Sequence, residues 1–82
     1  MKQYNKRIEL KNIKTRFKIS LINKAETQES VNKHINKTNN FLTKFFAGEA
    51  RLSKEEAQKI CKYLDVDLED LFGETFIKNE WR

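Results

Sequence analysis

Four polar residues near the middle of the chain have side chains suited to hydrogen bonding with the flat edges of a partner. They are Asn39, Asn40, Thr43 and Lys44, called here the polar cluster. An asparagine amide can pair bidentately with adenine, a threonine can contact a thymine methyl group, and a lysine can reach guanine or a phosphate. If one helix presents all four on its outer side, the sequence predicts a surface for nucleic acid.

The apolar residues around the polar cluster predict two short helices joined by a tight turn, at about 28–45. Their expected buried residues are spaced at i, i+4 and at i, i+3: Val31 with Ile35, and Leu42 with Phe45. Helices this short are not stable alone, so both must pack on one core. This is the pattern of a helix-turn-helix, and it leaves the polar cluster outside.

Capping residues predict where these two helices begin and end. Thr27 is expected to cap the first helix. Asn36 follows the last apolar residue of that helix, and asparagine tolerates the left-handed conformation that a sharp turn requires. We expect Thr38 to cap the second helix, at about 38–47, and Gly48 to end it.

Three more helices are predicted, which makes the fold all-α. One spans about 11–24, a second spans about 54–64 after the capping box that begins at Ser53, and a third, short one begins at about Asp67 and stops at Gly73. The chain has no proline and only two glycines, too few turn residues for a β-sandwich or barrel of this size.

The 82 residues are enough for one domain, which we expect at 11–73 as a compact five-helix unit. A basic arm at 1–10 would precede it, in which Ile8 and Leu10 could form a short strand or a lead-in. A tail at 74–82 would follow. The apolar residues of the tail leave a strand, a helical turn or an assembly surface open: Phe76, Ile77 and Trp81.

The chain resembles the phage repressor/Cro-type (XRE-type) helix-turn-helix domain over about 11–73. The resemblance rests on Thr27 to Gly48, on Leu52-Ser53, and above all on the run KICKYLDVDLEDLF at 59–72. It implies a lambda-repressor-like fold whose third helix enters the major groove of double-stranded DNA.

The sequence departs from the pattern of that family inside the helix-turn-helix. The family usually has a small residue at the position of Asn32, a glycine at Asn36 and an apolar residue at Lys37. Phe41 and Phe46 stand beside the polar cluster, where exposed aromatic side chains would be more typical of a protein contact.

Carried over by position, the resemblance implies that Asn39, Asn40 and Thr43 read bases. It implies contacts to the DNA backbone from the following residues: Gln28, Lys37, Thr38, Lys44 and Arg51.

The basic arm adds three candidate contacts, because such arms wrap the duplex in some DNA-binding proteins. They are Lys2, Lys6 and Arg7. A terminus that only adds solubility is an equal alternative.

The charge is divided unevenly along the chain. Residues 1–51 hold 12 Lys/Arg and 4 Asp/Glu, a net charge of +8, whereas residues 52–82 hold 5 and 8, a net charge of −3. The first half is therefore suited to an anionic partner, namely nucleic acid, an acidic protein or an anionic membrane surface. A membrane is disfavoured, because no apolar run is long enough to span it and the basic residues lack one large apolar face.

An enzyme is not expected, because the sequence lacks a nucleophile–base pair, a phosphate-binding loop and a set of metal ligands. Cys61 and His34 are the only residues of their kinds, so neither a disulfide nor a zinc site is predicted. We expect no cofactor, and a lone thiol fits the reducing cytoplasm, where the protein would associate with the nucleoid.

The expected function is sequence-specific regulation of transcription, in a phage or other mobile element, by a homodimer or together with a partner repressor. Two alternatives remain open. One is an antirepressor or protein-interaction modulator built on the same fold, and the other is a recombination or excision accessory factor.

Overall fold

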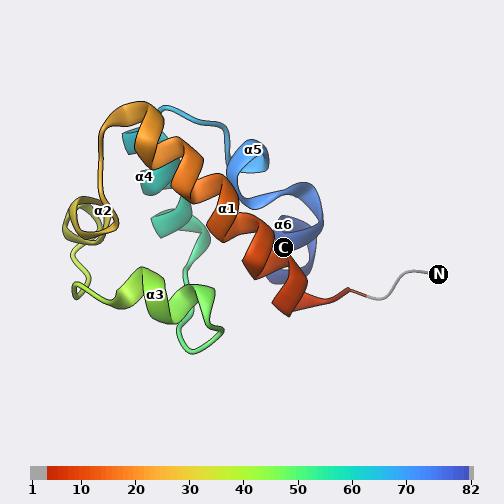
Figure 1. Ribbon diagram of the computed structural model, residues 1–82. Helices are drawn as coiled ribbons and strands as arrows, with labels where there is room; N and C mark the ends of the chain where they lie inside the picture. Colours follow the sequence, from red (N-terminus) through yellow and green to blue (C-terminus); the bar gives the residue numbers. More distant parts are fainter. Residues whose placement is uncertain (1–3, 82) are drawn as a thin grey trace.

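The computed structural model describes residues 4–81, which form an all-α fold with six helices and no strand within that range (Figure 1). The expected fold class is confirmed, with one helix more than the five predicted. The helices are α1 (Lys6–Lys24), α2 (Gln28–His34), α3 (Phe41–Phe46), α4 (Lys54–Leu64), α5 (Leu68–Phe72) and α6 (Glu74–Glu80).

The first helix begins at Lys6, five residues earlier than predicted. The side chain of Asn5 caps it by accepting a hydrogen bond from the backbone N–H of Ile8. Ile8 and Leu10 therefore lie in the helix, and neither is part of a strand or a lead-in. Leu10 continues the buried face of α1 toward the N-terminus, and the whole face is Leu10, Ile13, Phe17 and Leu21.

In Figure 1, α1 runs diagonally across the molecule, with α2 and α3 on one side and α5 and α6 on the other. It packs against α3, α4, α5 and α6. One central helix thus supports α3 of the predicted motif as well as α4 and the two C-terminal helices. None of the helices in residues 4–81 has the length and apolar composition needed to cross a membrane.

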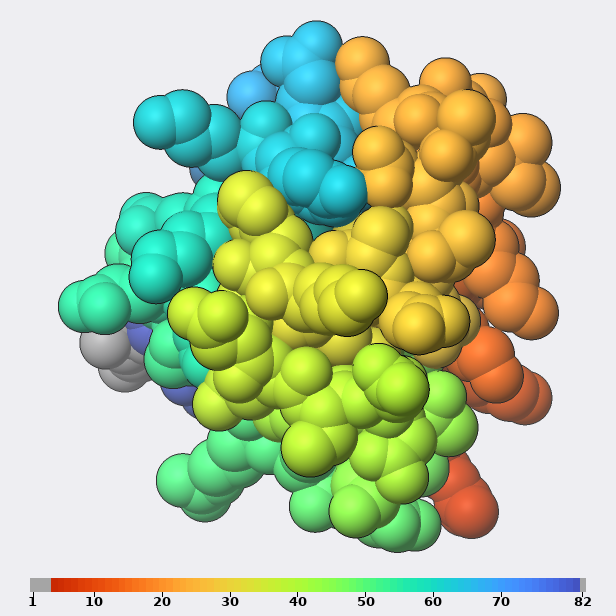
Figure 2. All heavy atoms as spheres, turned by 90° about the vertical axis from the view of Figure 1, so that its left-hand side faces the viewer, coloured from red at the N-terminus to blue at the C-terminus, as the bar shows by residue number. Residues whose placement is uncertain are grey.

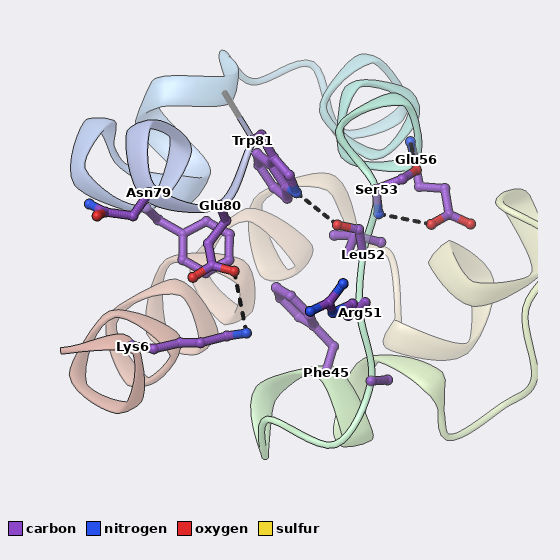
Figure 3. Close-up of a pocket in the computed structure, with 11 residues that line it drawn as sticks. Lys6, Phe45, Arg51, Leu52, Ser53, Glu56, Asn79, Glu80 and Trp81 are labelled. Carbon is purple, nitrogen blue, oxygen red and sulfur yellow. Dashed lines mark hydrogen bonds and ion pairs between the residues drawn. The ribbon is translucent and has the colours of Figure 1, made fainter. Parts of the chain in front are cut away.

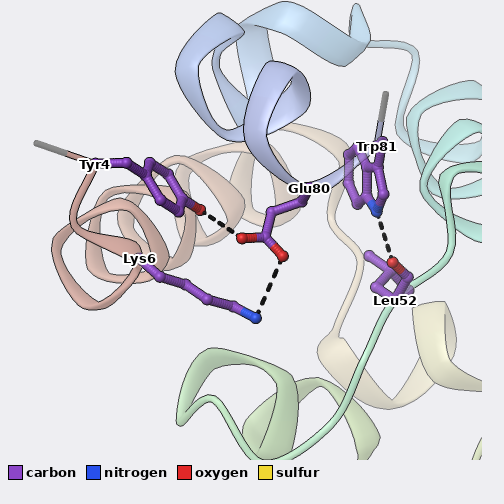
Figure 4. Close-up of polar contacts among 5 residues, drawn as sticks. All are labelled: Tyr4, Lys6, Leu52, Glu80 and Trp81. Carbon is purple, nitrogen blue, oxygen red and sulfur yellow. Dashed lines mark hydrogen bonds and ion pairs between the residues drawn. The ribbon is translucent and has the colours of Figure 1, made fainter.

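The tail, for which the sequence left three forms open, is the helix α6 and covers part of the core. Phe76 is 1% exposed, and its ring centroid lies 6.1 Å from that of Phe45 in an edge-to-face arrangement. Trp81 packs edge-on against Phe72 and donates a hydrogen bond from Nε1 to the carbonyl oxygen of Leu52, at 2.8 Å (Figure 4).

Several helices end at a residue with left-handed backbone, as the turn chemistry predicts. Asn36 has φ 60° after α2, and Gly48 has φ 81° after α3, both as expected. At Gly48 the turn is closed by hydrogen bonds from the N–H of Gly48 to the Phe45 carbonyl and from the N–H of Glu49 to the Lys44 carbonyl. The second half of the motif therefore has a well-defined end.

The capping box predicted at Ser53 is present at the start of α4. The Ser53 side chain accepts from the N–H of Glu56, and the Glu56 carboxylate accepts from the N–H of Ser53. Cys61 is buried on the inner face of this helix, as predicted, and burial raises the pKa of its thiol to about 12.

Candidate nucleic-acid interface

The helices α2 and α3, with the connection between them, form the predicted helix-turn-helix. Thr27 caps α2, and Thr27 and Ser30 each accept a hydrogen bond from the backbone N–H of the other. The four predicted apolar residues are all buried: Val31, Ile35, Leu42 and Phe45. The apolar spacing thus places both short helices on one core, as the sequence predicted.

All four residues of the polar cluster are exposed. Figure 2 shows the face formed by the segment from α2 through α3 (yellow to green), which runs across its centre and lower part. The second half of α1 borders this segment on one side, and α4 borders it on the other. The helix-turn-helix therefore covers much of this face.

The third helix is shorter than predicted and begins at Phe41 instead of Thr38. The Thr38 hydroxyl donates to Oδ1 of Asn40 at 3.1 Å and does not cap the helix. The Thr38 carbonyl accepts from the N–H of Phe41, which closes a turn over 38–41. Asn39 and Asn40 consequently lie on the turn that leads into α3, whereas Thr43 lies within the helix itself.

Asn32 connects α2 to this turn from the inside. Its side chain is fully buried, and Nδ2 donates a hydrogen bond to the carbonyl oxygen of Asn39 at 2.8 Å. The sequence showed a polar residue where the resembling family has a small one, but it did not show what that residue contacts. Only the packing of α2 against the turn reveals this link.

Lys37 is held by two contacts on the surface. Its Nζ lies 2.9 Å from Oε2 of Glu56 on α4 and 5.1 Å from the centroid of the Phe41 ring. Partial burial opposes ionisation of the Glu56 carboxyl, but hydrogen bonds from Lys37 and Ser53 outweigh it and hold its pKa below the usual range. When nothing else is bound to the protein, Lys37 therefore links the turn to α4.

The other cations predicted to contact the DNA backbone are more open. Lys44 and Arg51 are exposed, and no carboxylate among the described residues forms an ion pair with either. Gln28 is half-buried at the first position of α2, and Thr38 is exposed on the turn. These residues, with the polar cluster, lie on or next to the motif.

The three residues predicted as arm contacts differ in where they lie and in what they contact. Lys2 lies outside the described residues. Lys6 is in α1, and its Nζ lies 3.3 Å from Oε1 of Glu80, whose other oxygen accepts from the Tyr4 hydroxyl (Figure 4). Arg7 is exposed on the first turn of α1. The start of α1 is thus attached to α6.

Phe41 and Phe46 are not the exposed aromatics that the sequence suggested. Both are half-buried and pack against the core. The Phe46 ring meets that of Phe17 edge-on, with the centroids 5.4 Å apart. The first and last residues of the six-residue helix α3 thus also pack on the core.

A pocket of about 530 Å³ lies between α6 and the segment that precedes α4 (Figure 3). Its charged side chains are mixed in sign: Lys6, Arg51, Glu56 and Glu80. Within residues 4–81 no group of three histidine, cysteine or acidic side chains is placed to hold a metal ion. The pocket is a mixed polar crevice, whereas the polar cluster lies on the exposed helix-turn-helix.

Comparison with known families agrees with this geometry. The profile of the Cro/C1-type helix-turn-helix DNA-binding domain matches residues 16–75, from the second half of α1 to the start of α6. Searches among curated proteins and among solved structures gave no significant match. Since the matched region includes the entire motif and most of the chain, the protein belongs to the Cro/C1-type helix-turn-helix DNA-binding family.

Proposed function

We propose that this protein is a sequence-specific regulator of transcription in a phage or other mobile element, and that α3 enters the major groove of double-stranded DNA. The observation that carries the proposal is the exposure of the whole polar cluster on a motif whose apolar residues are all buried. Family membership supports DNA binding, and the polar cluster supplies side chains able to read bases.

In this proposal Asn39, Asn40 and Thr43 contact base edges. Asn39 and Asn40 approach from the turn, where their short side chains are free of helical packing, and Thr43 approaches from the first turn of α3. An asparagine that pairs bidentately with adenine contributes about 1–3 kcal/mol of discrimination against other bases. Sequence selectivity would therefore come mainly from the two asparagines.

The DNA backbone is contacted by residues on both sides of the polar cluster. Lys44 and Arg51 are open to phosphates, and Gln28, at the first position of α2, binds a further phosphate. Lys37 contributes less than Lys44, because it must give up its ion pair with Glu56 before it can bind a phosphate. Thr38 contacts the backbone beside the turn. Lys6 and Arg7 in the first turn of α1, and Lys2 before it, add further contacts to the DNA backbone.

In this proposal the protein binds a two-fold symmetric site as a homodimer or together with a partner repressor, because symmetric operators are read by paired motifs. It acts in the cytoplasm. An alternative role as an antirepressor rested on Phe41 and Phe46 and on the tail with Phe76 and Trp81, and the packing of all four rings on the core weakens that support. A recombination or excision accessory factor shares the same interface, and it would bend its site, which a circular-permutation assay measures.

Fluorescence anisotropy with labelled duplex DNA at a series of salt concentrations tests the proposal. Affinity should fall steeply with salt, and Lys44→Ala should reduce the slope of log K against log salt by about one. Lys78→Ala removes the same charge from α6, away from the motif, and should leave the slope unchanged. Absence of duplex binding at low salt would rule out the proposed function.

A further inference from the structure

Asn32 is the one fully buried polar residue in the part of the chain that the structure describes, and it lies on the inner side of α2. Its amide faces the carbonyl oxygen of Asn39 at 2.8 Å. Because a carbonyl can only accept, the atom that faces it must be the NH₂ group, which fixes the orientation of the amide. This hydrogen bond joins the interior of the domain to the turn that carries the predicted base readers.

The oxygen atom of the same Asn32 amide lowers the stability of the folded state. Oδ1 of Asn32 is buried and has no hydrogen-bond partner among the described residues. A buried acceptor without a partner destabilises the folded state, whereas a small apolar side chain would not. Asn32 is therefore poorly explained by stability alone, and its donated hydrogen bond is the feature that needs a reason.

The acceptor of this hydrogen bond, the Asn39 carbonyl, indicates why a donor is present at position 32. The carbonyl of Asn39 and the N–H of Asn40 belong to one planar peptide group, so holding the carbonyl orients the backbone of both asparagines. Backbone hydrogen bonds from the N–H of Phe41 to the Thr38 carbonyl and from the N–H of Lys44 to the Asn40 carbonyl also shape the turn, but neither engages the Asn39 carbonyl, and α3 lacks a side-chain N-cap. The other side-chain contacts of this segment, from Lys37 to Glu56 and from Thr38 to Asn40, lie on the surface where water competes.

We propose that Asn32 is a positioning residue that determines DNA sequence selectivity without touching DNA. It holds the peptide between Asn39 and Asn40 in one orientation, so that both side chains reach base edges at a defined angle. The inference rests on the proposed function, because it assumes that these asparagines read bases. It assigns a role to a residue that lies beneath the interface and that no contact with DNA would reveal.

Asn32→Leu tests the role with little change in side-chain shape, because leucine has the same branched outline and no donor. The experiment measures dissociation constants for a duplex selected from a random library and for a scrambled duplex of equal length. We expect the variant to fold, to bind the scrambled duplex as the unmodified protein does, and to lose about tenfold in the ratio of the two constants. Asn79→Leu is the matched control, because it removes an asparagine amide that donates to a backbone carbonyl on α6, away from the motif, and it should keep the ratio.

Amide ¹H–¹⁵N spectra of the free proteins provide the structural readout. Asn32→Leu should shift and broaden the signals of Asn39 and Asn40 and leave those of α4 in place. A folded variant with an unchanged selectivity ratio overturns the inference while the proposed function stands. If the unmodified protein does not distinguish the two duplexes, the proposed function fails first, and the selectivity role of Asn32 fails with it.

Should Asn32→Leu fail to fold, Asn32→Ala provides the second variant, because it removes the donor without adding volume. The same tenfold loss of selectivity is expected. In the unmodified protein, slow solvent exchange of the Asn32 side-chain NH₂ protons is expected, since they are buried and bonded to the turn. Fast exchange of both protons would contradict the hydrogen bond on which the inference depends.

Discussion

At the scale of single residues, the candidate interface combines side chains that the sequence identifies with contacts that only the fold reveals. The exposure of the polar cluster follows from the spacing of the buried residues around it. The Lys37–Glu56 pair does not, because the two residues lie nineteen positions apart and meet only when α4 packs beside the turn. Lys37 was predicted to contact DNA, and its neighbour on α4 gives it a second role in the free protein.

This pair leads to a prediction about pH. The folded protein lowers the pKa of the Glu56 carboxyl, so its contribution to stability is present at neutral pH and is lost as the pH falls through that lowered value, below 4.5. Lys37→Met should raise the pKa of Glu56 toward its ordinary value, because the opposing charge is gone. A carboxyl titration followed by NMR measures this. Because Lys37 is partly exposed, the loss of stability should stay below about 1 kcal/mol, and an unchanged pKa would contradict the pairing.

At the scale of helices, the sequence predicts most of the elements and fails where a boundary depends on an isolated polar side chain. The caps at Thr27 and Ser53 were predicted because each stands before a clear apolar pattern. The start of α1 was missed because Asn5 lies in a stretch read as a basic arm. The start of α3 was placed three residues early, because Thr38 bonds to Asn40 and not to the helix.

The left-handed helix ends give a prediction about stability. Gly48→Ala should destabilise the domain by about 1 kcal/mol, because φ 81° is strained for any residue with a Cβ atom. The added methyl group would meet only Leu10, at an ordinary 3.8 Å, so the effect comes from the backbone. Ala25→Gly at φ 53° should have the opposite sign and a similar size. Urea denaturation measures both changes, and equal signs would refute this account of the turns.

At the scale of the whole molecule, α6 and the Trp81 that follows it cover part of the core. The sequence identified the apolar residues of the tail but could not choose their structure, since seven residues are too few for a clear helical pattern. The packing of Phe76 and Trp81 against Phe72 resolves the choice. The helices α5 and α6 thereby support α1 from the side opposite α2 and α3 (Figure 1).

Removal of the Trp81 side chain should therefore weaken the entire domain. Trp81→Ala loses the contacts with two phenylalanine rings and the hydrogen bond to the Leu52 carbonyl, and we expect a loss of about 3 kcal/mol in the free energy of unfolding. Trp81→Phe keeps the ring contacts and should lose only about 1 kcal/mol. Thermal unfolding followed by circular dichroism compares the two. Equal stability of Trp81→Ala and the unmodified protein would show that the tail is not part of the core.

The central claim is that the face formed by α3 and the turn before it reads DNA sequence. Selection of bound duplexes from a random library tests it most directly, with the unmodified protein compared to a variant in which Asn39, Asn40 and Thr43 are all alanine. We predict a defined enriched sequence for the unmodified protein and for Lys78→Ala, and loss of that enrichment in the triple variant. No enriched sequence, or enrichment that survives the triple substitution, would contradict the claim.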